Sequence, residues 1–181
     1  MATNARYAVK FRRRRENITN YRKRLNLLKS GKLRFVVRMT NRYIISQIVE
    51  YNPDGDRVLI SVNSKELMKY GWKFSCKNTP AAYLTGFLCG IKFKNKFPER
   101  ENSMILDIGL RRSTKGGRIY AVLKGALDSN LDIPHSDKIL PDESRIKGEH
   151  ISKEVAENFN NLLIQLKNLQ IGVGEKTNKG G

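Results

Sequence analysis

The residues of this sequence that could hold a metal ion or attack a substrate are few and widely spaced. Cys76 and Cys89 lie thirteen positions apart, and His135 and His150 follow far downstream. Zinc sites bring their cysteine and histidine ligands as closely spaced pairs, so this spacing does not predict a metal site. Two isolated cysteines are typical of an intracellular protein, and we expect both thiols to be buried and reduced.

Three other motifs contain the letters of catalytic sites without the spacing that catalysis needs. Residues 135–137 read His-Ser-Asp, but consecutive side chains do not point at one another, so a polar loop is expected there. Residues 113–118 (STKGGR) and 172–174 (GVG) contain glycines but match no phosphate-binding motif. Asp107 is the one candidate for a nuclease carboxylate, and a single carboxylate cannot hold two metal ions. The sequence therefore predicts no enzyme, no metal site and no cofactor.

Positive charge is the dominant chemical feature of the chain. Its 181 residues include 35 Lys and Arg against 17 Asp and Glu, a formal net charge of +18. A free protein with this imbalance repels itself, so we expect a polyanionic partner. A membrane surface is the alternative to nucleic acid, but no apolar run approaches the ~20 residues of a membrane span, and no secretory signal is recognisable. A nucleic acid bound in the cytoplasm is the partner that the composition favours.

The charge is concentrated at the N-terminus, where residues 1–42 hold fourteen basic residues against one acid, Glu16. The basic residues are Arg6, Lys10, Arg12, Arg13, Arg14, Arg15, Arg22, Lys23, Arg24, Lys29, Lys32, Arg34, Arg38 and Arg42. Tyr7, Phe11 and Tyr21 are interleaved with them. Aromatic rings can stack on unpaired bases while guanidinium groups bind phosphates. A segment so highly charged has no core of its own, so we expect it to be disordered without RNA.

Two alternatives stay open for this arm. A basic tail for a nucleus or a membrane surface would carry similar charge, but the aromatic residues and the basic helix expected over 21–29 favour RNA. Tyr21 lies at helical spacing from Leu25 and Leu28, so it either stacks on RNA or packs along its own helix. If Tyr21 packs, stacking depends on Tyr7.

The segment after the arm has the pattern of a three-stranded antiparallel meander. Residues 33–38, 43–50 and 57–62 are rich in β-branched and aromatic side chains, as strands are. Residues 52–55 (NPDG) predict the second turn, because proline presets φ and glycine accepts a positive φ. A fourth, short strand is expected over 104–106.

Two apolar helices are expected to cover this sheet. The first has Thr79 as its N-cap and Pro80 at its first helical position, and Gly86 and Gly90 would let it lie close to the strands. Its apolar residues, which should face the sheet, are Tyr83, Leu84, Phe87, Leu88 and Ile91. The apolar residues of the second helix are Ile119, Val122, Leu123 and Ala126. The sequence therefore predicts an α/β fold, a mixed β-sheet sandwich built from a meander, a helix, a strand and a helix.

We divide the chain into four parts. These are a basic RNA-binding arm and helix over 1–30, an α/β globular domain over 31–134, a C-terminal helical extension over 135–170 and a flexible tail over 171–181. The extension contains an amphipathic helix expected over 152–169. In the domain, the loop before the second helix carries Arg111, Arg112, Lys115 and Arg118. This loop either brings charge and a close-lying glycine backbone to RNA, or is a solvated start of the helix.

Seven segments are similar to a known family of ribosomal proteins. They are residues 7–16 (YAVKFRRRRE), 19–25 (TNYRKRL), 27–32 (LLKSGK), 82–86 (AYLTG), 106–110 (LDIGL), 125–135 (GALDSNLDIPH) and 145–151 (RIKGEHI). In this order they resemble the archaeal form of the 5S-rRNA-binding family of the large subunit, called protein eighteen in bacteria and five in eukaryotes. The resemblance covers about residues 5–155, and the sequence departs most from the family beyond residue 153.

The resemblance implies a non-catalytic role in docking 5S rRNA onto the large-subunit rRNA in the central protuberance, beside neighbouring large-subunit ribosomal proteins. No membrane and no small-molecule substrate are implied. The residues that we expect to contact RNA are Tyr7, Lys10, Arg12, Arg13, Arg14, Arg15, Tyr21, Arg22, Lys23, Arg24, Lys29, Lys32, Arg34, Arg38, Arg42, Arg111, Arg112, Lys115 and Arg118.

Two other classes of protein are less consistent with the sequence. An RNA-processing enzyme needs convergent carboxylates or a metal cluster. A general RNA-binding or RNA-chaperone protein outside the ribosome would share the arm, but would have no reason to keep residues 106–109 and 131–135 intact.

Overall fold

The structure is a computed structural model that describes the backbone of residues 7–171 and the side chains of residues 7–169. Arg6, the glycines of 172–174 and the expected tail beyond its first residue lie outside these described residues. The elements, in chain order, are α1 (Arg12–Arg15), α2 (Tyr21–Leu28), β1 (Leu33–Met39), β2 (Ile44–Glu50), β3 (Arg57–Asn63), η1 (Ser64–Tyr70), α3 (Thr79–Lys96), β4 (Met104–Asp107), α4 (Arg118–Asp128), η2 (Asp137–Ile139), α5 (Glu143–Lys147) and α6 (Lys153–Ile171).

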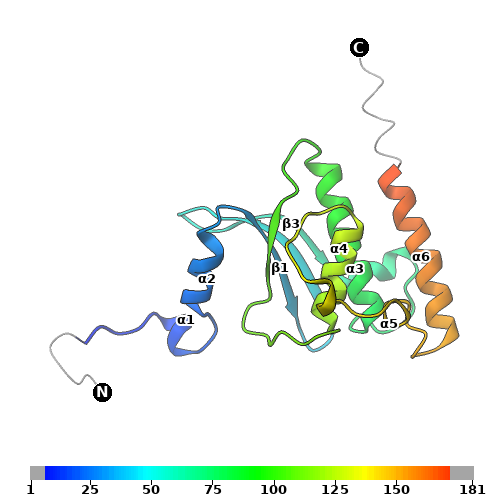
Figure 1. Cartoon of the computed structure of the whole chain (residues 1–181), viewed down its shortest axis with the longest axis horizontal. Helices are drawn as coiled ribbons and strands as arrows, with labels where there is room; N and C mark the ends of the chain where they lie inside the picture. Colours follow the sequence, from blue (N-terminus) through cyan, green and yellow to red (C-terminus); the bar gives the residue numbers. More distant parts are fainter. Residues whose placement is uncertain (1–6, 172–181) are drawn as a thin grey trace, which may run out of the picture.

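The strands form one mixed sheet in the order β3-β2-β1-β4. The first three strands are an antiparallel meander, as predicted, and β4 pairs in parallel with β1. The parallel pairing follows from the crossover through α3, which returns the chain to the edge of β1 (Figure 1). The α/β fold expected from the sequence is confirmed.

The helices divide between the two sides of this sheet. Helices α3 and α4 lie on one side with α5 and α6 beyond them, whereas α2 lies on the opposite side (Figure 1). Side chains alternate along β1, so Phe35 and Val37 point into the helical layer and are fully buried. The same alternation places Arg34 and Arg38 on the face toward α2, which is how the sheet comes to present charge to the arm.

The close approach of α3 is to α4 and not to the strands, so the expected role of its glycines was wrong. A Cβ on Gly86 would collide with the backbone carbonyl of Val122, and a Cβ on Gly90 with the side chain of Ser129. Gly125 of α4 is restricted in the same way by the Tyr83 carbonyl. Helices pack this tightly only where both backbones lack side chains at the crossing point.

Two details of the start of α3 also differ from expectation. The N-cap is Asn78, whose side chain accepts a hydrogen bond from the Ala81 N–H, so Thr79 and Pro80 are the first two helical residues. Tyr83 is buried but does not face the sheet. Its ring lies against Phe159 of α6 and its hydroxyl donates to Asp128 of α4. Helix α3 is apolar on several sides because α4 and α6 cover the faces that the sheet does not.

The C-terminal helix is part of the main core. The amphipathic helix expected over 152–169 is α6, and Val155, Phe159, Leu162 and Leu166 on it are buried in the same apolar cluster as the sheet. The C-terminal extension and the α/β domain therefore share one hydrophobic core.

Candidate nucleic-acid interface

The run of four arginines forms α1, a single helical turn. The turn is held by hydrogen bonds to local groups, since Arg13 Nε donates to Thr19 Oγ1 at 2.9 Å. Arg12 Nε lies 3.9 Å from Glu16 Oε1, and the two residues are one helical turn apart. All four arginines are exposed, and the ion pairs of the described residues include neither Arg14 nor Arg15. This segment presents positive charge outward at several angles.

The aromatic residues of the arm divide into two groups. Tyr7 is 48% exposed, and the ring pairs of the described residues do not include it. Phe11 and Tyr21 pack on each other, with ring centroids 5.5 Å apart and planes tilted by 49°. Leu25 is 55% exposed, so α2 has no buried stripe that would include Tyr21. Tyr21 packs on Phe11, and whether it also stacks on RNA stays a prediction.

Helix α2 is attached to the sheet by polar contacts. Asn20 caps the helix by accepting from the Lys23 N–H. On the side facing the sheet, Lys23 Nζ donates to the Gly109 carbonyl at 3.1 Å, and Arg24 Nη2 donates to Asp56 Oδ2 at 2.8 Å. The arm thus contacts both the turn before β3 and the loop after β4.

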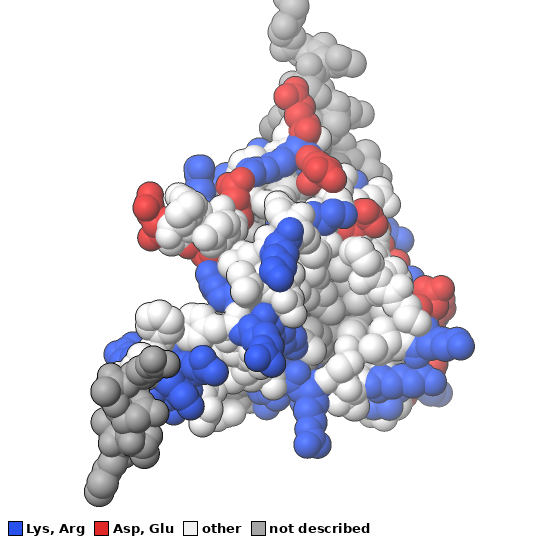
Figure 2. All heavy atoms as spheres, turned by 60° about the vertical axis from the view of Figure 1, so that its left-hand side comes forward, with Lys and Arg blue, Asp and Glu red and all other residues white. Residues whose placement is uncertain are grey.

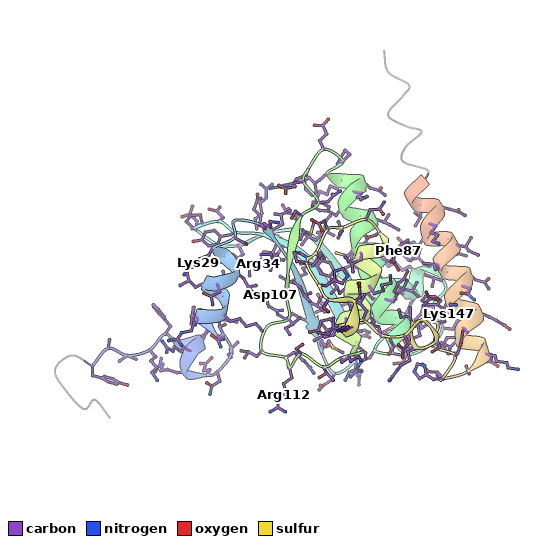
Figure 3. All side chains as sticks on the ribbon, viewed as in Figure 1. Lys29, Arg34, Phe87, Asp107, Arg112 and Lys147 are labelled. Carbon is purple, nitrogen blue, oxygen red and sulfur yellow. The ribbon has the colours of Figure 1, made fainter. Side chains whose placement is uncertain are left out.

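An ion-pair network continues from this contact into the sheet. Asp56 also pairs with Arg34 at 2.5 Å, and Arg34 reaches Asp107 at 3.3 Å. Asp107 in turn accepts from Arg38 at 3.0 Å and from the Gly109 N–H at 2.8 Å. Figure 3 places Arg34 and Asp107 close together beside α2, on the side of the helix that faces the strands. We call this set, together with Arg24, the arginine–aspartate network.

Asp107 keeps its negative charge within this network. Burial alone would raise the pKa of the Asp107 carboxyl, but the charge of Arg38, the Gly109 N–H and the nearby Arg34 together hold that pKa below its ordinary value. The same contacts occupy its oxygens. Asp107 therefore organises arginines and the loop after β4, and it is not placed to bind a metal ion.

The structure gives the two arginines of β1 different surroundings. Arg34 is 3% exposed and pairs with two carboxylates, so its guanidinium offers no free face to a phosphate. We therefore leave Arg34 out of the interface. Arg38 is hydrogen-bonded to Asp107 and to the Val37 carbonyl, yet its side chain is 42% exposed and its outer edge remains open.

A cleft of about 440 Å³ lies between α2, α1 and the loop after β4. Its charged residues are Arg13, Lys23, Arg24 and Arg38, with Asp107 as the one carboxylate among the described residues that line it. Positive side chains that converge on an open cleft favour an anionic occupant, and guanidinium groups bind phosphate oxygens in particular. The cleft is therefore suited to a phosphate group of a nucleic acid.

The loop between β4 and α4 extends the basic surface. Arg112 and Lys115 are exposed, and Figure 3 shows Arg112 projecting away from the protein. Arg111 and Arg118 are also exposed but are held by donating to the carbonyls of Met39 and Lys77, each at 3.0 Å. The backbone of the loop itself requires its two glycines. Gly116 has a φ of +65°, and a Cβ on Gly117 would lie 2.8 Å from the Thr114 carbonyl oxygen.

The remaining predicted residues are exposed around this surface. Lys10, Arg22, Lys29 and Arg42 are open to solvent, and Lys32 donates to Ser103 at 2.6 Å. Figure 2 shows Lys and Arg gathered over the lower part of this face, whereas Asp and Glu lie along its upper and outer edges. Sequence reasoning missed the contribution of Asp56, because its partners come from α2 and β1 and no local spacing indicates them.

The described residues contain two separate cysteines and no cluster of metal-ligating side chains. Cys76 and Cys89 are both buried and free, as expected, and burial raises the pKa of the Cys89 thiol to about 12. Within the described part of the chain, no three metal-ligating side chains come together. No helix there is long and apolar enough to cross a membrane.

Comparison with known proteins finds one family of ribosomal proteins. The family described as ribosomal large-subunit proteins 60S L5 and 50S L18 matches residues 5–103 and 98–136. A large ribosomal subunit protein uL18 from Korarchaeum cryptofilum is 57% identical over 152 residues, which are 84% of this chain and 76% of the relative. The uL18 of Methanosphaera stadtmanae is 53% identical over 153 residues, covering 84% of this chain and 78% of the relative.

A third relative covers more of both chains. The uL18 of Methanospirillum hungatei is 49% identical over 162 residues, which are 90% of this chain and 91% of the relative. These relatives are archaeal, and they are structural ribosomal proteins rather than enzymes, as the sequence predicted. The chain belongs to the ribosomal large-subunit protein family of L5 and L18.

Proposed function

We propose that this protein binds 5S rRNA and anchors it to the large-subunit rRNA in the central protuberance, in contact with neighbouring ribosomal proteins. Family membership gives the setting, which is the large ribosomal subunit in the cytoplasm. The observation that carries the RNA part of the proposal is the basic cleft between α2 and the sheet, continued by the exposed arginines of α1.

The binding mechanism is mainly electrostatic. Each Lys or Arg that neutralises a phosphate releases counterions, so an arm with many exposed cations binds RNA with a strong dependence on salt. The docked position of α2 adds shape selectivity, because Lys23 and Arg24 are held at fixed places on the sheet. A-form RNA hides its base edges in a deep groove, so the protein reads backbone shape and a few unstacked bases.

A general RNA-binding or RNA-chaperone role outside the ribosome is the alternative. A chaperone needs exposed charge and mobility but no fixed arrangement of arginines. The arginine–aspartate network fixes α2 against the sheet through Asp56, which favours recognition of one RNA shape.

The test is competition binding at physiological salt. Purified full-length protein is titrated into labelled 5S rRNA transcript from an archaeal source, with unlabelled 5S rRNA or bulk transfer RNA as competitor. We expect specific binding at least ~10³-fold tighter than that of the transfer RNA competitor, the lower end of specific nucleic-acid recognition. Equal competition by the two RNAs would support the general RNA-binding alternative.

A further inference from the structure

A second group of basic side chains lies at the ends of the helices. Lys77 precedes α3, Arg118 begins α4, Arg145 lies on α5 and His150 follows it. We call these four residues the helix-end patch. Arg118 joins it to the loop before α3 by donating to the Lys77 carbonyl at 3.0 Å. Arg118, Arg145 and His150 line one open pocket of about 310 Å³.

The lysine and the two arginines of this patch have no carboxylate partner among the described residues. Arg118, Arg145 and His150 are exposed, and the ion pairs of the described residues include none of the four members of the patch. The carboxylate of Glu143 on α5 pairs instead with Lys147. This differs from the arginine–aspartate network, where Arg34 pairs with two carboxylates, so the cations of the helix-end patch remain open to an anion from outside.

The backbone around the pocket also carries partial positive charge. The first turns of α3 and α4 both reach it, through Thr79 and Gly117, and the N-terminal end of a helix carries partial positive charge. The N-cap of α4, Gly117, has no side chain to satisfy the free N–H groups of that first turn. The helix ends thus add to the attraction that Arg118 and Arg145 exert on an anion.

The helix-end patch and the arm lie on different sides of the molecule. Helix α2 lies on one side of the sheet, and α5 lies beyond the helical layer on the other (Figure 1). In Figure 3, Lys29 on α2 and Lys147 on α5 mark these opposite sides, with Arg112 on the loop between them. An RNA segment lying along α2 would therefore face the side of the sheet opposite to α5.

We propose that the helix-end patch binds the phosphate backbone of a second RNA segment, contributed by the large-subunit rRNA, while the arm and cleft bind 5S rRNA. This inference rests on the proposed function and assigns its two RNAs to two surfaces. A protein partner fits the patch less well, because protein interfaces have an apolar centre. Of the described residues that line the pocket, Ile151 is the one large exposed apolar side chain.

The test uses the full chain with two substitutions in the helix-end patch, Lys77→Gln and Arg145→Gln, which together remove two positive charges. A matched control variant carries Lys65→Gln and Lys69→Gln, exposed residues on η1 outside the pocket. Two affinities are measured, that of the protein for 5S rRNA transcript and that of the protein–5S complex for large-subunit rRNA transcript. Thermal melts of the free proteins check that both variants are folded.

We expect the patch variant to bind 5S rRNA within ~2-fold of the unchanged protein, and its 5S complex to bind large-subunit rRNA ~10-fold or more weakly, with a lower salt slope. The control variant should change neither affinity. An unchanged second affinity would overturn the inference, and so would an equal loss of 5S binding, which would assign the patch to the 5S site. Failure of the unchanged protein to bind 5S rRNA would instead contradict the proposed function, and binding of large-subunit rRNA alone would still test the patch.

Discussion

Asp107 shows how a single carboxylate can organise a basic surface. Its side chain is 9% exposed and lies between Arg34 and Arg38, and Asp107 is the last residue of β4. Buried charges of one sign repel each other unless an opposite charge lies among them. Asp107 therefore lets β1 carry two arginines on one face, and one of them, Arg38, stays open toward the cleft.

Asp107→Asn should destabilise the folded protein. The substitution leaves Arg34 buried with one of its two carboxylate partners, and removing one partner of a buried ion pair costs about 3 kcal/mol or more. Urea unfolding at pH 7 measures this change in the free energy of unfolding. Asp137→Asn is the matched control, because its side chain is 97% exposed and should change stability little. A loss for Asp107→Asn as small as that of the control would contradict the role of the network.

The same residue predicts a pH dependence. The pKa of Asp107 is lower in the folded state than in the unfolded chain, so its contribution to stability is complete above the unfolded value, ~3.9. That contribution is lost as the pH falls below this value through the folded pKa. The difference in unfolding free energy between the unchanged protein and Asp107→Asn should be constant from pH 7 to about 5 and shrink below about 4. Urea titrations across this range measure it, and a difference that stays constant at low pH would contradict the prediction.

Tyr7 is 48% exposed, and the ring pairs of the described residues do not include it, unlike Phe11 and Tyr21. If it stacks on an unpaired base, Tyr7→Ala should weaken 5S rRNA binding by about 1 to 3 kcal/mol, while Tyr7→Phe should be nearly silent. The slope of log affinity against log salt should not change, because no charge is lost. Tyr51, which is 51% exposed after β2, gives the matched Tyr51→Ala control. Equal small effects of the two alanine variants would mean that Tyr7 faces solvent.

At the scale of elements, local pattern predicted the strands and helices because each has its own signal. β-branched runs separated by turn residues gave β1, β2 and β3, and apolar residues at helical spacing gave α3, α4 and α6. The 3₁₀ segment η1 was missed. It depends on a capping box between Asn63 and Glu66, in a stretch without the apolar spacing of a helix.

The contacts between elements could not be predicted in the same way. Arg34 was counted as an RNA contact because it lies among other arginines, but its partners Asp56 and Asp107 are 22 and 73 positions away. Gly86 was assigned to the strands, because one sequence does not say which neighbour a helical glycine faces. The sequence shows where each charged residue lies along the chain, but which carboxylate an arginine pairs with depends on the tertiary fold.

The exposed arginines of α1 should act as independent phosphate contacts. Arg14 and Arg15 are the suitable pair to remove, since Arg13 holds the following turn through Thr19. Replacing both by alanine should lower the slope of log affinity against log salt by about 1.4 to 1.8, at about 0.7 to 0.9 per lost contact. Filter binding across a salt series measures the slope. Lys65→Ala with Lys69→Ala removes the same charge elsewhere and should leave it unchanged, and a similar decrease for both pairs would indicate a general charge effect.

The crossing of α3 and α4 should tolerate no added methyl group. Gly86→Ala would push a Cβ into the Val122 carbonyl, which is backbone and cannot rotate away. Alanine favours a helix over glycine by about 1 kcal/mol, but overpacking a tight core costs about 1 to 3 kcal/mol or more, so a net loss of stability is expected. Thermal unfolding measures it. A Gly86→Ala protein that is as stable as the unchanged chain would mean that the two helices can separate at little cost.

At the scale of the whole molecule, the hydrophobic core and the basic arm that we propose to bind 5S rRNA lie in different parts of the chain. The buried apolar cluster begins with Phe35, and the described arm before it contributes no buried residue. The arm touches the domain through polar contacts, chiefly those of Lys23 and Arg24, which are partly exposed and individually weak.

Deleting residues 1–30 should therefore leave a folded domain that binds RNA poorly. The truncated chain keeps β1 and the pairs of Arg34 with Asp56 and Asp107, so a cooperative thermal transition should remain, lowered by at most a few degrees. Affinity for 5S rRNA should fall by orders of magnitude, because α1, α2 and the arm's side of the cleft are lost together. Calorimetry measures the thermal transition and filter binding measures the affinity, both on the same preparation.

The full-length Arg24→Ala variant is the control. It loosens α2 but retains the other arm cations, so it should bind 5S rRNA with an intermediate affinity. A truncated protein that does not fold would mean that the arm is part of the core. Unchanged 5S rRNA binding would move the interface to the domain alone.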